Sequence, residues 1–140
     1  MTQDITAYGS AILWLSLFYH MFVGAAVLVS VQFTRLIAKK LYSLTLPENL
    51  DPRYEFVLKP LGTYAVMTTV LCGYALWTKN TEFRFFMLAL LALLYVMRAL
   101  VRLFYRDLFF RAYATPFKRN LVNIVFNLAL AGSILIFGGF

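Results

Sequence analysis

Residues 8–33 read YGSAILWLSLFYHMFVGAAVLVSVQF, and no lysine, arginine, aspartate or glutamate occurs among them. A helix crosses the hydrocarbon core of a bilayer with about 20 mainly apolar residues, so this stretch is long enough to span it. Three further stretches qualify, at residues 57–77, 85–104 and 121–137. They lack the period-two alternation that the strands of a membrane barrel show. The sequence therefore predicts an all-α integral membrane protein, a bundle of four transmembrane helices.

The composition leaves no material for a separate soluble domain. Hydrophobic residues make up 62% of the chain and charged residues 14%, and so few charges do not cover a soluble globule. The longest polar interval, residues 34–59, is about half the size of the smallest domains that fold alone. We expect one transmembrane domain over residues 1–140, with the first apolar stretch retained because it lacks a convincing cleavage site.

Basic residues are concentrated on one side of the predicted bundle. Only Lys79 and Arg84 lie on the opposite side. Because positively charged loops stay in the cytoplasm, loops 34–59 and 105–119 are expected to be cytoplasmic and both termini to lie on the other side. The net charge of +7 suits anionic lipid headgroups, and we expect no nucleic-acid partner. The eleven residues on the basic side are Arg35, Lys39, Lys40, Arg53, Lys59, Arg98, Arg102, Arg106, Arg111, Lys118 and Arg119.

The acidic residues and the single histidine limit the chemistry of the chain. Carriers coupled to protons or cations place a carboxylate at membrane depth, and none is expected there. One histidine and one cysteine, Cys72, provide no metal cluster, no disulfide within the chain and no haem held by two histidines of the same chain. The six acidic residues fall in loops or at span ends: Asp4, Glu48, Asp51, Glu55, Glu82 and Asp107.

His20 lies near the middle of the first span and shares a helical face with Ser16 and Gly24. One hypothesis is a haem ligand or a proton relay. The other is a neutral imidazole hydrogen-bonded to a neighbouring helix, with Gly24 allowing the helices to approach closely. We favour the second because no partner histidine or intramembrane acid accompanies His20.

Three arginines spaced four residues apart, Arg98, Arg102 and Arg106, close the third span, with Tyr95 nearby. They predict a row of guanidinium groups down one side of a helix, which is suited to a carboxylate, phosphate or sulfonate. Arg98 lies roughly 9 Å inside the cytoplasmic end at helical rise and is the first choice as a ligand contact. For Arg102 and Arg106 we favour anchoring by water and headgroups at the interface.

Asn120, Asn123 and Asn127 form one polar face in the fourth span. Such a face should point at other helices, where asparagine side chains stabilise helix association. Together with the face around His20, it gives four short helices more polar surface than they easily hide. We therefore expect a homo-oligomer or a larger membrane complex.

Three local motifs accompany the four spans: Ala7-Tyr8 at the start of the first, Asp51-x-Arg53-x-Glu55-x-Val57 entering the second, and residues 98–105 closing the third. With these motifs, the arrangement resembles the MAPEG superfamily, the membrane-associated eicosanoid and glutathione metabolism proteins. The resemblance implies four helices, a trimer, glutathione as cofactor and a glutathione-dependent or lipid-modifying activity. The arginine, asparagine and glutamate of that family's second helix have no counterpart in residues 57–66. The topology is also similar to the four-helix haem-binding protoporphyrinogen oxidases, which implies haem b at His20.

These observations favour a non-catalytic membrane subunit or scaffold whose basic cytoplasmic rim binds anionic lipid or ligand. A MAPEG-like enzyme and a haem- or quinone-linked redox protein remain as alternatives, and the sequence does not decide whether the chain is an enzyme. No catalytic residue and no metal site is predicted. The candidate ligand-binding residues are Arg98, Arg102, Tyr95, Asn123, Asn127 and His20.

Overall fold

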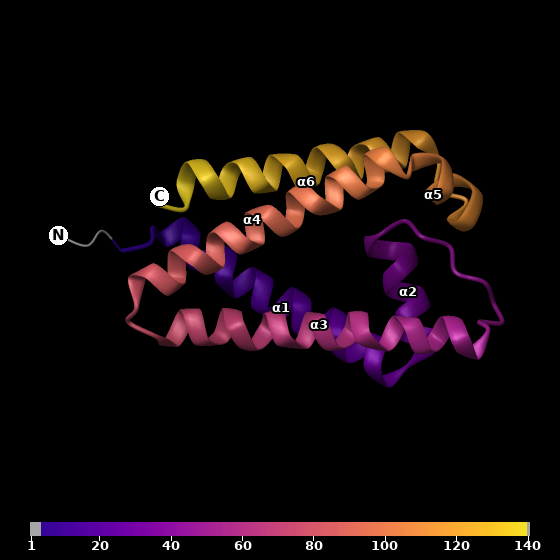
Figure 1. The fold of residues 1–140 in the computed structure, drawn as a ribbon, viewed down its shortest axis with the longest axis horizontal. Helices are drawn as coiled ribbons and strands as arrows, with labels where there is room; N and C mark the ends of the chain where they lie inside the picture. The colour runs from indigo at the N-terminus through magenta and orange to yellow at the C-terminus, as the bar shows by residue number, and fades with distance from the viewer. Residues whose placement is uncertain (1–3, 140) are drawn as a thin grey trace.

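A computed structural model describes residues 4–139, and this part of the chain forms six helices (Figure 1). Four of them, α1, α3, α4 and α6, are long and apolar enough to cross a membrane. The prediction of an all-α, four-helix membrane bundle is confirmed, and the chain is a multi-pass membrane protein. The helices are α1 (Ala7–Val29), α2 (Val31–Leu41), α3 (Pro52–Trp77), α4 (Thr81–Phe104), α5 (Arg106–Tyr113) and α6 (Phe117–Phe137).

The first span ends four residues earlier than expected because the backbone breaks at Ser30. Ser30 is extended, with φ −146° and ψ 127°, and its hydroxyl accepts a hydrogen bond from the backbone N–H of Phe33. That bond caps α2, which starts as a new helix instead of continuing α1. At the next span, Asp51 caps α3 by accepting from the backbone N–H of Arg53 at 2.7 Å. Pro60 lies inside α3, in its third turn.

The four spans form two pairs, in which α1 packs along α3 and α4 packs along α6. A Cβ atom added at Gly24 would lie 3.0 Å from the carbonyl oxygen of Gly62, closer than ordinary contact. Glycine at both positions lets the backbones of α1 and α3 approach closely. The expectation that Gly24 allows close approach is confirmed. Lys59 fixes the same crossing, because its ammonium donates to the carbonyl oxygens of Val27 and Leu28 at the end of α1.

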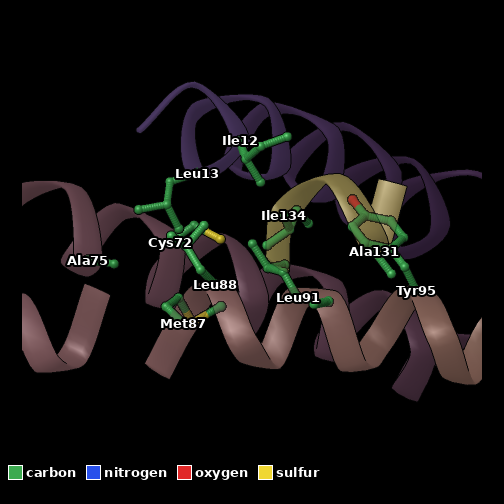
Figure 2. Packing of buried hydrophobic residues seen from close by; sticks show 11 residues of the cluster. Ile12, Leu13, Cys72, Ala75, Met87, Leu88, Leu91, Tyr95, Ala131 and Ile134 are labelled. Carbon is green, nitrogen blue, oxygen red and sulfur yellow. The ribbon is translucent and has the colours of Figure 1, made fainter. Parts of the chain in front are cut away.

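The tightly packed core lies at the end of the bundle that carries the two termini. Figure 2 shows Leu13, Cys72, Met87, Leu88 and Ile134 converging from all four spans, and each of them is fully buried. We call this region the terminal end. Both described ends of the chain meet there, with the backbone N–H of Thr6 donating to the carbonyl of Gly138 at 3.4 Å.

The connecting segments meet at the opposite end, which we call the basic end. There the backbone N–H of Thr45 donates to the carbonyl of Tyr113, and the Thr115 hydroxyl donates to the carbonyl of Ser43. The Tyr54 and Tyr113 hydroxyls are 2.7 Å apart. Figure 1 shows the two helix pairs drawing apart toward this end, where α2 and α5 lie. The spans are therefore packed around a buried core at the terminal end, whereas at the basic end the helix pairs stand apart and are joined through the connecting segments.

Candidate functional site

Two adjoining hollows lie toward the basic end, where the helix pairs separate. The first hollow has a volume of about 690 Å³ and is bounded by α1, α4, α6 and the segment after α2. The second has a volume of about 590 Å³ and is bounded by α1, α2, α3 and α4. Tyr42, Leu44, Leu94 and Arg98 line both, so these residues form the shared wall. Both volumes fall within the range of roughly 300–1,000 Å³ that is usual for small-molecule sites.

The six candidate ligand-binding residues surround these two hollows. His20 lines the second hollow, and Arg98 lines both. The other four line the first hollow: Tyr95, Arg102, Asn123 and Asn127. The six candidates come from three helices, so their position around the hollows depends on how α1, α4 and α6 pack.

Arg98 is half-buried in the shared wall and is held between aromatic rings. Its guanidinium carbon lies 5.8 Å from the ring centroid of Tyr19 and 5.6 Å from that of Tyr95. Ring faces attract cations at these distances, most strongly where water is excluded. Within residues 4–139, no acidic side chain forms an ion pair with Arg98. The side chain therefore holds a positive charge between two apolar hollows without a carboxylate to balance it.

Arg102 differs from its expected role as an interfacial anchor. It is buried, 6% exposed, and donates to the side-chain oxygen of Asn120 at 3.0 Å and to the carbonyl of Tyr42 at 2.7 Å. In return, the Asn120 amide donates to the carbonyl of Arg102 at 3.0 Å. Its guanidinium also lies over the ring of Phe109, at 5.1 Å. Arg102 therefore joins α4 to α6, to the end of α2 and to α5.

The row of three arginines expected along one helix does not form. α4 ends at Phe104, and Arg106 begins the separate helix α5. The Arg106 side chain is 61% exposed and lies 3.5 Å from Asp107. Arg98 and Arg102 share α4 at this end, and Arg98 forms no ion pair within residues 4–139, so Arg98 remains the candidate contact for an anion.

The asparagine face of α6 divides into two parts. Asn120 is buried and makes the reciprocal bonds to Arg102, as expected for a residue that joins helices. The amides of Asn123 and Asn127 instead donate to carbonyls one turn earlier in α6, at 2.9 and 2.7 Å. All three asparagine amides thus have partners within the chain, so α6 offers less unpaired polar surface for a second chain to cover than the sequence suggested. Self-association stays a prediction.

His20 is almost fully buried, 2% exposed, and bonds to its own helix instead of a neighbouring one. Its Nδ1 atom lies 2.8 Å from the carbonyl oxygen of Ser16, one turn earlier. The other ring nitrogen, Nε2, is buried without a partner in the described chain. No group of three or more histidine, cysteine, aspartate or glutamate side chains gathers anywhere in residues 4–139. A haem at His20 would need its second axial ligand from a residue of another type or from another chain.

The pair Tyr19 and Tyr42 is part of the site that sequence reasoning missed. Their hydroxyl groups are hydrogen-bonded to each other, and the backbone carbonyl of Tyr42 accepts from Arg102. Tyr42 caps the C-terminus of α2, so its position depends on the break at Ser30 that turns α2 away from α1. An unbroken helix through residue 33 would carry Tyr42 away from Tyr19, and no local pattern in the sequence marks the pair.

Comparisons with protein-family models, with curated proteins and with solved structures found no match to this chain. The resemblances to MAPEG proteins and to haem-binding oxidases therefore remain expectations, and the function is argued from the geometry of the two hollows.

Proposed function

We propose that this chain is a non-catalytic membrane subunit or scaffold that binds an anionic amphiphile, through Arg98, in the first hollow. The observation that carries the proposal is the guanidinium of Arg98, half-buried among aromatic rings with no ion pair to an acidic side chain in residues 4–139. An unbalanced charge at this depth is costly, and a bound anion would remove that cost.

The lining of the first hollow supports an amphiphile in preference to a small polar anion. Most of its surface is apolar, with Leu15, Met97, Phe126 and Leu130 among the walls. A hydrocarbon chain would cover these side chains, while a carboxylate or phosphate head would meet the planar fork of the guanidinium. The lining contains no acidic, histidine or cysteine side chain, which favours binding over acid-base or thiolate catalysis.

The proposal places the basic end in the cytoplasm. Loops 34–59 and 105–119 would then face the cytoplasmic leaflet, and exposed basic residues such as Lys39, Lys40 and Arg111 would contact anionic headgroups. An amphiphile could enter the first hollow from that leaflet. We further propose that the subunit acts within a homo-oligomer, a trimer if the MAPEG resemblance is real, or within a larger membrane complex.

Binding of dodecyl phosphate to the protein in phosphatidylcholine nanodiscs tests the proposal, with zwitterionic dodecylphosphocholine as the comparison ligand. Arg98→Leu should weaken dodecyl phosphate binding at least about tenfold, because a hydrogen bond to a charged group contributes about 1.5–3 kcal/mol. Arg98→Lys should recover only part of the loss, since a point charge lacks the bidentate fork. Arg106→Leu is the matched control, because it removes the same charge from an exposed residue outside both hollows.

Equal losses in Arg98→Leu and Arg106→Leu would reject a specific site and leave only the net charge of the basic end. The same preparation decides between the enzymatic alternatives. Thermal stabilisation by glutathione would favour a MAPEG-like enzyme, and a Soret band in the purified protein would favour a haem protein.

A further inference from the structure

His20, which lines the second hollow, carries a hydrogen-bond acceptor that the described part of the protein leaves unused. A carbonyl oxygen only accepts, so the 2.8 Å contact with Ser16 places the proton of His20 on Nδ1 and leaves a lone pair on Nε2. Protonation of both nitrogens would bury a charged N–H without an acceptor, which is costly. Nε2 has no partner within residues 4–139. Because side-chain polar atoms buried this deeply nearly always have one, the partner is to be sought outside the described residues.

The walls of the second hollow indicate what kind of molecule would supply that partner. Val23, Ile37 and Ala65 are buried apolar side chains, and Arg98 is the only charged residue in the lining. Leu61 and Tyr64, on the membrane-spanning helix α3, belong to the lining and are exposed. The hollow is therefore not sealed along α3, which gives a molecule dissolved in lipid a way into it.

We propose that the second hollow binds a neutral, mainly apolar molecule through a hydroxyl group that donates a hydrogen bond to Nε2 of His20. Alcohols and phenols carry this donor, whereas ethers, ketones and quinones offer only acceptors and would face a bare lone pair. Nε2 itself is covered in this structure, so binding includes a side-chain movement that uncovers it. The inference goes beyond the anion site, because it concerns another hollow, another residue and an uncharged ligand.

The single histidine makes the test direct, since labelling with 15N-histidine reports on His20 alone. In phosphatidylcholine nanodiscs, 15N NMR should find Nδ1 protonated and Nε2 bare. The probes are 4-nonylphenol and 1-dodecanol, each compared with its methyl ether at equal mole fraction in the bilayer. A hydroxyl probe should shift the Nε2 resonance and bind about tenfold more tightly than its ether, the effect of one net hydrogen bond. If only 4-nonylphenol has this effect, the ligand class is a phenol; if only 1-dodecanol has it, the ligand class is an alcohol.

Three outcomes would overturn the proposal: a proton on Nε2, an Nε2 resonance that neither hydroxyl probe changes, or equal affinity for each probe and its ether. These measurements use the wild-type chain, so they test the proposal even if a variant fails to fold.

Variants add a second test. His20→Phe should bring the ratio of hydroxyl probe to ether to about one, because the ring volume stays and the acceptor goes. Thr69→Val is the control, since its hydroxyl donates to the carbonyl of Ala65 and lines neither hollow; it should keep the ratio. Loss of dodecyl phosphate binding is measured in Arg98→Leu, and loss of the preference for a hydroxyl probe is measured in His20→Phe, so the anion proposal and this one fail by different results.

Discussion

Asn120→Leu should destabilise the bundle by removing the contact that joins α6 to α4 at the basic end. The substitution deletes the acceptor for Nη1 of Arg102 and the donor to its backbone carbonyl, both at 3.0 Å in buried surroundings. A hydrogen bond to a charged group contributes about 1.5–3 kcal/mol. An interhelical hydrogen bond between neutral groups in a membrane protein contributes about 0.6 kcal/mol. We expect a loss of about 2–3 kcal/mol, since both bonds disappear together.

The control is Asn123→Leu, three positions further along the same helix. Its amide donates to the carbonyl of Arg119 in α6 and joins no second helix, so the expected loss is below about 0.5 kcal/mol. The free energy of unfolding of both variants can be measured by circular dichroism of the helices during unfolding in a denaturing detergent, with linear extrapolation to zero denaturant. In a double-mutant cycle of Asn120→Leu with Arg102→Met, the coupling energy should be about 1–2 kcal/mol. Equal losses in the two asparagine variants, or zero coupling, would refute the reasoning.

Three further predictions concern packing, pH and orientation. Gly24→Ala should cost about 1–3 kcal/mol by overpacking the α1–α3 crossing, whereas Gly132→Ala, with nothing within 4 Å of the new Cβ, should cost nothing in the same unfolding assay. The hydrogen bond from Arg84 holds the pKa of the Asp4 carboxyl below its ordinary value. The Asp4–Arg84 pair therefore stabilises the folded protein above about pH 4, and this stabilisation is lost as the pH falls through the folded pKa. Asp4→Asn should reduce the fall of the melting temperature at acid pH. Cysteines introduced at Thr45 and Asn80 should be labelled from opposite sides of the membrane, with residue 45 cytoplasmic, and labelling of residue 45 from outside would reverse the proposed orientation.

The four spans could be predicted because each carries its signal locally, as a long apolar stretch that only a helix can present to lipid. The break at Ser30 could not, since Val29, Val31 and Phe33 on either side of it continue the apolar stretch without a charge or a proline. Without that break, α2 and Tyr42 cannot be placed.

The candidate site was predictable as residue types and not as an arrangement. Arg98 and His20 stand out as polar side chains inside apolar stretches, and both line the hollows. The roles of Arg102 and Asn120 depend on the rotation of α4 and α6 about their axes, which no local pattern gives. An arginine with a partner eighteen residues away looks the same in the sequence as one exposed to headgroups.

The placement of the larger buried core at the terminal end has a mechanical consequence. The two helix pairs share this core near the termini and separate toward α2 and α5, where hydrogen bonds such as Tyr54–Tyr113 and Arg102–Tyr42 join them instead, so a tilt of one pair about the terminal end would strain those bonds. A 24-residue helix such as α4 is about 36 Å long. A tilt of about 5° at the terminal end would move its far tip by about 3 Å, roughly the thickness of a hydrocarbon chain. Filling or emptying the hollows would thus change the cross-section of the protein in one leaflet and leave it unchanged in the other, which couples their occupancy to the curvature and lateral tension of the bilayer.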